Sequence, residues 1–313
     1  MKPLEGRVAV VAGATRGAGR GIARMLGEAG ATVYCTGRSS RTRPNTSAHH
    51  YAGRPETIEE TAEMVEAAGG RGIPVRVDHT VEKEIAAFFR RVRKEQGRLD
   101  LLVNVLTGRP VKSWGTFWKL DVADGLDQLG GWLAPHAMTL RHAAPLMIAG
   151  KSGLIVEIVE QHTLGHHGQF WFDLYEIALK RLAYAAAEEL APHNVAAVAI
   201  TPGFMRTEAI LEQFGVTEAN WRDAVNDPVA KGYGWAGSET PCFIGRAIAA
   251  LAADPVALTR SGGIYSSWGL SDEYGFSDVS GERPHLWRYW EREFPHLTSG
   301  KPATGKIWEV RPG

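Results

Sequence analysis

The sequence predicts an α/β fold, a doubly wound parallel sheet of about seven strands with helices on both faces. Short apolar runs, typical of strands buried on both sides, alternate with segments of helical apolar spacing. A glycine-rich turn directly follows the first run. Strands that alternate with helices are joined by right-handed crossovers, and they therefore form a parallel sheet. We expect a single domain over residues 1–270 and a C-terminal extension over residues 271–313.

The first predicted strand leads into a turn that suits an anion. Gly13, Gly17 and Gly19 follow the strand, and apolar residues then recur at helical spacing from Ile22. A strand, a glycine turn and a helix start leave backbone N–H groups unpaired, which favours a phosphate. Side chains would obstruct that approach, which gives the glycines a physical reason. Tight packing of the strand on the helix is the alternative explanation.

The rest of the chain continues the alternation. The predicted strands span residues 8–11, 31–35, 73–77, 99–103, 154–159, 195–200 and 263–267. After the first helix, the predicted helices span residues 55–68, 81–96, about 135–149, 170–190 and 241–253. The segment 202–238 is predicted to be irregular. No repeat or low-complexity stretch divides the chain.

Composition excludes several classes of function. The 313 residues have a formal net charge of zero, so we expect no nucleic-acid or membrane partner. No run of eighteen apolar residues and no signal peptide is visible, and the two cysteines, Cys35 and Cys242, cannot build a disulfide framework. We therefore expect a cytoplasmic protein. Ten tryptophans favour an apolar pocket, a subunit contact or a well-filled core.

Four motifs occur in an order that carries a family resemblance. Gly13 to Gly19 have the spacing G-x-x-x-G-x-G, Asp78 lies in VRVDHT, LLVN ends at Asn104, and TPGFMRT begins at Thr201. Together they resemble the short-chain dehydrogenase/reductase superfamily over residues 6 to about 268. The resemblance implies a Rossmann-type fold, a dinucleotide cofactor, a small-molecule substrate and a homo-oligomer, either dimer or tetramer. The cofactor-binding residues that it implies are Gly13, Thr15, Arg16, Gly17, Ala18, Gly19, Arg38, Asp78, Asn104, Pro202, Gly203 and Thr207.

The charges near the second strand favour NADP (NADPH) over NAD. The extra 2′-phosphate of NADP binds guanidinium groups and is repelled by a carboxylate. The second strand runs into Thr36, Gly37 and Arg38 without an acidic residue, and Arg16 lies in the glycine turn. We expect Arg38 and Arg16 to hold the phosphate, with Arg41 or Arg43 assisting. A solvated basic loop is the alternative.

The catalytic positions depart from the family pattern. The family uses a tyrosine, a lysine four residues later, a serine about twelve residues before the tyrosine, and an asparagine on an earlier helix. One register takes Tyr175 as the tyrosine, but Leu179 then stands at the lysine position and Lys180 points off the helix face. The apolar pattern of the helix favours a second register, with Phe172 and Glu176 at the two positions.

The second register leaves this chain an atypical member that lacks the Asn-Ser-Tyr-Lys tetrad. It places Glu160, or Val159, at the serine position, and no asparagine occurs between Asn104 and Asn194. Phe172 carries no proton to donate. Ketone reduction by the family mechanism is therefore not expected.

Other groups near the expected nicotinamide end offer replacement chemistry. The catalytic candidates are Glu160, His162, Phe172, Tyr175 and Glu176. Two close carboxyl groups would raise the pKa of one of them, a histidine titrates near neutral pH, and Tyr175 offers a phenol one turn from Phe172. Exposed loop histidines and a buried packing tyrosine are the alternatives. His162, His166 and His167 have no familiar metal-ligand spacing, so no metal is expected.

Two late segments bear on the substrate. Residues 203–240 fall where the family carries a substrate lid, and their aromatic side chains favour an apolar or aromatic ligand. The tail after residue 271 closes the pocket or contacts another subunit. Three hypotheses remain open: an NADP(H)-dependent oxidoreductase with a rearranged proton donor, a non-redox isomerase, cyclase or lyase that uses Glu160, Glu176 and His162, or a non-catalytic NADP(H)-binding protein.

Overall fold

A computed structural model describes residues 2–44, 53–106, 114–160 and 168–295. Seven parallel strands form one sheet in the order β3-β2-β1-β4-β5-β6-β7, as predicted for a Rossmann-type fold. The strands are β1 (Val8–Ala12), β2 (Thr32–Gly37), β3 (Arg71–Arg76), β4 (Leu101–Asn104), β5 (Gly153–Ile158), β6 (Val195–Thr201) and β7 (Ile264–Ser266). The order reverses between β1 and β4, where folds of this kind open a crevice for a ligand.

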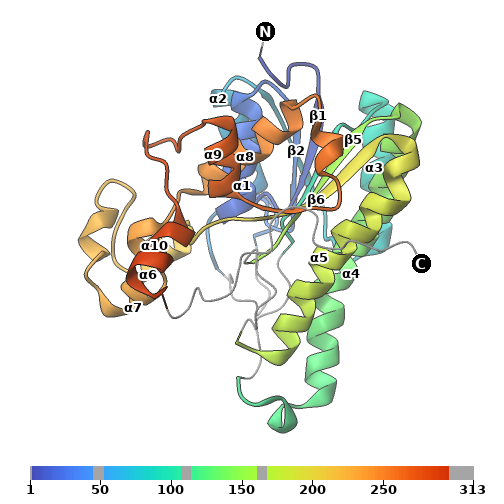
Figure 1. Cartoon of the computed structure of the whole chain (residues 1–313). Coiled ribbons are helices and arrows are strands. Elements are labelled where there is room, and N and C mark those ends of the chain that lie inside the picture. The colour runs from blue at the N-terminus through green and yellow to red at the C-terminus, as the bar shows by residue number, and fades with distance from the viewer. Residues whose placement is uncertain (1, 45–52, 107–113, 161–167, 296–313) are drawn as a thin grey trace.

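Helices cover both faces of the sheet (Figure 1). The α-helices of the described residues are α1 (Gly17–Glu28), α2 (Ile58–Ala67), α3 (Glu82–Gln96), α4 (Val122–Gly150), α5 (Phe170–Leu190), α6 (Glu208–Gln213), α7 (Pro228–Gly232), α8 (Pro241–Ala253), α9 (Ser267–Tyr274) and α10 (Leu286–Glu293). One apolar core joins the sheet to α1, α2 and α8, and a second joins it to α3, α4 and α5. Among the described residues no helix is both long and apolar enough to span a bilayer.

Helix α4 is longer than the sequence predicted. The apolar pattern identified only its C-terminal half, yet the helix begins at Val122, where the Asp121 side chain accepts a hydrogen bond from the Asp124 N–H and caps it. Pro135 lies inside the helix and has no N–H to offer the carbonyl of Gly131. In Figure 1 the N-terminal parts of α4 and α5 extend side by side beyond the sheet.

The segment predicted to be irregular contains two short helices and a small core of its own. Helices α6 and α7 lie within residues 203–240, and Trp221, Ala224, Ala230 and Trp235 are buried together there. Helix α10 of the C-terminal extension packs against this core, since a Cβ at Gly237 would come within 2.8 Å of the Tyr289 Cβ. The described part of the extension therefore contacts the expected lid of its own chain.

Candidate functional site

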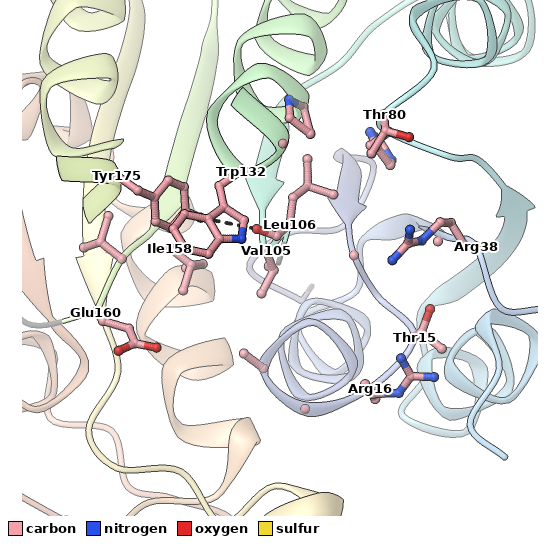
Figure 2. A pocket seen from close by; sticks show the side chains of 18 of the residues that line it. Thr15, Arg16, Arg38, Thr80, Val105, Leu106, Trp132, Ile158, Glu160 and Tyr175 are labelled. Carbon is pink, nitrogen blue, oxygen red and sulfur yellow. Dashed lines mark hydrogen bonds between the residues drawn. The ribbon is translucent and has the colours of Figure 1, made fainter. Parts of the chain in front are cut away.

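A pocket of about 1100 Å³ opens at the C-terminal edge of the sheet. Residues that directly follow four strands line it, namely Gly13 after β1, Val105 after β4, Val159 after β5 and Pro202 after β6. Figure 2 shows the two sides of this pocket. Thr15, Arg16, Arg38 and Thr80 form the side that we call the cofactor wall, and Trp132, Ile158, Glu160 and Tyr175 form part of the opposite side, the catalytic wall.

Packing requires a glycine at two positions of the first turn. Gly13 has φ +93°, and a Cβ there would lie 2.3 Å from the carbonyl oxygen of Val105. A Cβ at Gly19 would lie 2.1 Å from the Gly13 carbonyl oxygen. Only a residue without a side chain fits either position. Close packing therefore explains Gly13 and Gly19, and the approach of a phosphate to this turn stays a prediction.

The backbone N–H at Gly17 already binds an anion from the protein itself. It donates a hydrogen bond of 2.9 Å to Oε2 of Glu208, the first residue of α6. Arg20 lies 3.6 Å from the other oxygen of that carboxylate. The start of α1 therefore attracts negative charge, as a helix N-terminus does. Glu208 also lines the pocket and was not among the predicted site residues.

The guanidinium groups expected to hold a 2′-phosphate are both on the cofactor wall. Arg16 is fixed by Glu56, which accepts from its Nε at 3.2 Å, and by the hydroxyl of Ser39. Burial opposes ionisation of Glu56, but hydrogen bonds from Arg54 and Arg16 outweigh it and lower the pKa of that carboxyl. Arg38 lines the same wall and favours the ionised form of Asp78.

Other expected assisting residues have different surroundings. Arg41 forms a two-bond pair with Glu63 on the protein surface, both bonds 2.7 Å long. Neither Arg41 nor Arg43 is part of the pocket lining. The pocket does include Asp78, whose Oδ1 accepts hydrogen bonds from the N–H and hydroxyl of Thr80. Desolvation opposes its ionisation, but these bonds and nearby arginines lower the pKa of the Asp78 carboxyl.

Most of the predicted cofactor residues meet at this pocket. The lining includes Gly13, Thr15, Arg16, Gly17, Ala18, Arg38, Asp78, Pro202 and Thr207. Gly19, Asn104 and Gly203 lie behind it and are not part of the lining. Gly203 donates its N–H to the buried carboxylate of Glu239, which fixes the turn after β6. The three residues support the walls rather than form them.

On the catalytic wall, two glutamates and a lysine meet. Oε2 of Glu176 accepts the backbone N–H of Glu160 at 2.8 Å, and the Lys180 Nζ lies 3.6 Å from the same oxygen. Lys180 also donates to the Glu160 carbonyl at 3.1 Å. The spacing of five residues from Tyr175 predicts that Lys180 lies off the Tyr175 face, but Lys180 stands four residues after Glu176 and lies beside it, fully buried.

The environment of this cluster shifts its titration. Burial raises the pKa of Glu176 to about 7, against the opposing effect of Lys180. Burial also lowers the pKa of the Lys180 ammonium. Glu160 is exposed toward the pocket, yet desolvation by the surrounding protein raises the pKa of its carboxyl. A buried carboxyl group with a pKa of about 7 therefore lies on this wall.

Aromatic side chains form the rest of the catalytic wall. Trp132 of α4 contacts Phe172 and Tyr175 of α5, with ring centroids 5.9 and 5.2 Å apart. Tyr175 is buried, and its hydroxyl donates to the Leu106 carbonyl at 3.5 Å, as drawn in Figure 2. Burial and three nearby carboxyl groups raise the pKa of Tyr175 well above its usual value, so the phenol keeps its proton.

The aromatic residues that suggested an apolar ligand are not the ones that meet the pocket. Phe204, Phe214, Trp221 and Trp235 pack among themselves in the core of the 203–240 segment. Met205 of that segment does reach the pocket. The apolar surface comes mainly from α4 and α5 instead. His162, with His166 and His167, lies outside the described residues, and those that are described contain no cluster suited to a metal ion.

A buried hydrogen-bonded chain behind the catalytic wall was missed by the sequence analysis. Glu157, next to the C-terminal residue of β5, accepts from Nδ2 of Asn104 and pairs with Nδ1 of His136, each at 2.6 Å. All three side chains are buried. A glutamate within an apolar strand and a histidine within an apolar helix were the available signals, since such groups stay buried only with partners.

Comparison with known proteins identifies the family. A family model described as short chain dehydrogenase matches residues 7–214. The chain is 35% identical over 293 residues to Dehydrogenase/reductase SDR family member 1 of Mus musculus. The aligned region covers 90% of this chain and 86% of that protein. The Homo sapiens protein of the same name is 34% identical over 290 residues, and the aligned region covers 89% of this chain and 85% of that protein.

Solved structures agree on the fold. A short chain dehydrogenase from Mycobacterium thermoresistibile superposes with a TM-score of 0.71 and 19% identity over 99% of this chain and 97% of that one. A metagenomic short-chain oxidoreductase, solved in complex with NADP, superposes with a TM-score of 0.59 and 27% identity. The match covers 80% of this chain and 93% of that one. With the motifs and the parallel sheet, these matches establish the relationship: the chain belongs to the short-chain dehydrogenase family of oxidoreductases.

Proposed function

We propose that the protein is an NADP(H)-dependent oxidoreductase with a non-standard active site that acts on a small apolar or aromatic substrate. One pocket combines the two halves of such a site, and this observation carries the proposal. Its cofactor wall presents two arginines and an anion-binding N–H, and its catalytic wall presents a phenol, two carboxyl groups and aromatic surface.

The residues present fit an NADP cofactor. The Gly17 N–H binds a carboxylate in place of a phosphate, and Arg16 and Arg38 supply the charge that a 2′-phosphate requires. Gly13, Thr15, Ala18, Asp78, Pro202 and Thr207 complete the set that would hold it. Bound NADPH supplies a hydride. The structure related at 27% identity that was solved with NADP supports the same choice.

Tyr175 is the proton donor in this proposal. Phe172 and Glu176 stand where the family has tyrosine and lysine, so the usual donor is missing, whereas Tyr175 offers a protonated phenol on the pocket wall. A phenol with a high pKa is a weak acid, which suits an activated C=C or C=N bond better than an unactivated ketone. Trp132 and Phe172 give the substrate an apolar surface.

A second candidate function rests on the pair Glu160 and Glu176. Their contact, and a pKa of about 7 at Glu176, suit acid–base catalysis by an isomerase, cyclase or lyase without net redox change. A protein that binds NADP(H) without turnover is the remaining alternative. Neither accounts for the phenol and the cofactor wall in the same pocket as directly as hydride transfer does.

The test combines binding with turnover. Dissociation constants should favour NADPH over NADH by about tenfold or more, the effect of one lost charged contact. Loss of NADPH absorbance should then be followed with a panel of small aromatic substrates that carry activated C=C or C=N bonds. Consumption with at least one of them supports the proposal. Equal affinity for NADPH and NADH contradicts the choice of cofactor, and conversion of a substrate without NADPH consumption supports the acid–base alternative.

A further inference from the structure

The buried chain behind Tyr175 is more than a packing feature, because it holds charge directly against the phenol. The Tyr175 hydroxyl lies 3.4 Å from Nε2 of His136 and 3.5 Å from the Leu106 carbonyl oxygen. Nε2 of His136 itself lies 2.9 Å from that carbonyl. The phenol, the imidazole and the carbonyl therefore meet at one point of the catalytic wall, where Tyr175 and Leu106 line the pocket.

The partners of His136 fix its protonation. Nδ1 faces an oxygen of Glu157 at 2.6 Å and Nε2 faces the Leu106 carbonyl at 2.9 Å. Both partners are acceptors, so both ring nitrogens must carry hydrogen for the two bonds to form. Burial by itself would lower the pKa of His136, but the buried Glu157 carboxylate and its hydrogen bond outweigh that effect and raise it.

Hydrogen bonds also fix the Glu157 carboxylate in place beside His136. Its second oxygen accepts from Asn104 Nδ2 at 2.6 Å, so both carboxylate oxygens have donors although the side chain is fully buried. Removing one partner of such a buried charge pair lowers the free energy of unfolding by far more than the intact pair adds to it, because the other charge is left buried and unpaired. Three elements supply the parts: β4 the amide, β5 the carboxylate and α4 the imidazole.

We propose that His136, held as an imidazolium by Glu157, is the positioning residue that supports Tyr175 as proton donor and returns its proton. The inference rests on the proposed function for the donor role of Tyr175. It assigns to His136 and Glu157 the cationic support for which the family uses a lysine, a position taken here by Glu176. As in a catalytic triad, a carboxylate orients an imidazole, and the imidazole in turn acts on a hydroxyl group.

The proton balance is simple. A bound NADPH would supply the hydride to one substrate atom, and the Tyr175 hydroxyl would supply the proton to the neighbouring atom. The phenolate so formed is a stronger acceptor than the Leu106 carbonyl, so the His136 Nε2–H turns to it and transfers its proton. His136 is left neutral with its Nδ1–H on Glu157, and a solvent proton restores the imidazolium before the next cycle.

Other ionisable groups act on this unit and set its pH dependence. Glu157 of β5 and Glu176 of α5 favour the imidazolium, and Glu160 acts on the Tyr175 phenol. His79, which follows β3, interacts electrostatically with His136 and is itself kept neutral, since burial lowers its pKa to about 3. Activity should therefore fall as pH rises through the pKa of His136, because the neutral ring has no proton to return.

The direct test is nitrogen NMR of the full-length protein labelled with ¹⁵N-histidine. At pH 7 the His136 ring, assigned by loss of its signals in His136→Gln, should show two protonated nitrogens. A neutral His136 at that pH overturns the proposal whatever the enzyme turns over. This measurement needs neither cofactor nor substrate, so its failure is distinct from a failure of hydride transfer.

The functional test uses Glu157→Gln, which keeps the shape of the side chain and removes its charge. Turnover should fall by about tenfold or more with the KM for NADPH unchanged, and the high-pH loss of activity should move to lower pH. The matched control is His142→Gln, on the same helix and paired with Glu82 at 3.1 Å. An unshifted pH profile in a folded Glu157→Gln variant would overturn the proposal.

Discussion

The two walls of the pocket are built in different ways. The cofactor wall comes from the turns that follow three neighbouring strands, with Thr15 and Arg16 after β1, Arg38 after β2 and Thr80 after β3. The catalytic wall comes from α4, β5 and α5, and its groups meet only because the fold brings distant positions together. In our proposal the first wall holds NADP(H), and the second departs from the catalytic pattern of the family. The two walls can therefore be tested separately.

The largest expected effect belongs to the catalytic wall. Tyr175→Phe should lower kcat by about 100-fold or more, the usual contribution of a positioned proton donor, and leave the NADPH dissociation constant unchanged. Steady-state kinetics and cofactor titration check the two parts. Tyr184→Phe is the matched control, a buried tyrosine of the same helix. If Tyr175→Phe turns over like the parent, the phenol is not the donor.

A substitution on the cofactor wall should change the binding of NADPH. Arg38→Ala should weaken NADPH binding by about tenfold or more, since a guanidinium–phosphate contact is worth roughly 1.5–3 kcal/mol, and should leave NADH binding within about twofold. Arg41→Ala is the control, because Arg41 pairs with Glu63 away from the pocket. Titration by cofactor fluorescence measures both. An equal loss for NADPH and NADH would remove Arg38 from the phosphate site.

A third difference concerns stability, because the catalytic wall keeps a carboxyl group buried. The folded pKa of Glu176, about 7, lies above its unfolded value of 4.5, so its contribution is present below pH 4.5 and is lost as pH rises toward 7. Between pH 5 and pH 8 the parent protein should lose roughly 2–3 kcal/mol more unfolding free energy than Glu176→Gln, about 1.4 kcal/mol for each pH unit between 5 and the folded pKa. Urea titrations at the two pH values measure this. Parallel losses would show that Glu176 titrates normally.

The smallest expected effect concerns Glu208 on the cofactor wall. Its carboxylate accepts a hydrogen bond from the Gly17 N–H and adds negative charge where the phosphate of the cofactor is expected. Glu208→Gln should therefore tighten NADPH binding by about threefold, within the range of a helix N-terminus charge effect. Glu218→Gln, whose partner Arg206 lies outside the pocket lining, serves as the control in the same titration. Weaker binding by Glu208→Gln would assign the carboxylate a direct role in holding the cofactor.

The sequence predicted the fold because its signals are local. Apolar runs, glycine turns and helical spacing lie within short windows, and the limits of α5 and α8 agree with the predicted ranges. The start of α4 was missed although Val122, Leu126 and Leu129 recur there at helical spacing. Gly125, Gly130 and Gly131 lower the helix propensity of this part of the chain, and Val122 and Leu126 are largely exposed in the structure.

The candidate site was only partly predictable for the same reason. The glycine turn and Arg38 are readable from spacing and charge, whereas the contact of His136 with Glu157 joins residues that are 21 positions apart. Pairwise chemistry across a sheet and a helix depends on tertiary packing, which no single window contains. Lys180 illustrates the difficulty, since helix spacing from Tyr175 excluded it, while spacing from Glu176 places it in contact.

The central claim is that a cofactor wall of the family kind works with an altered catalytic wall to carry out a redox reaction. The most direct test is deuterium transfer from NADPH labelled at the transferable position of the nicotinamide to the product of any substrate that the enzyme converts, with the product analysed by mass spectrometry. The account predicts one deuterium in each product molecule. A product formed by the enzyme without deuterium, from either labelled face of the nicotinamide, would contradict it.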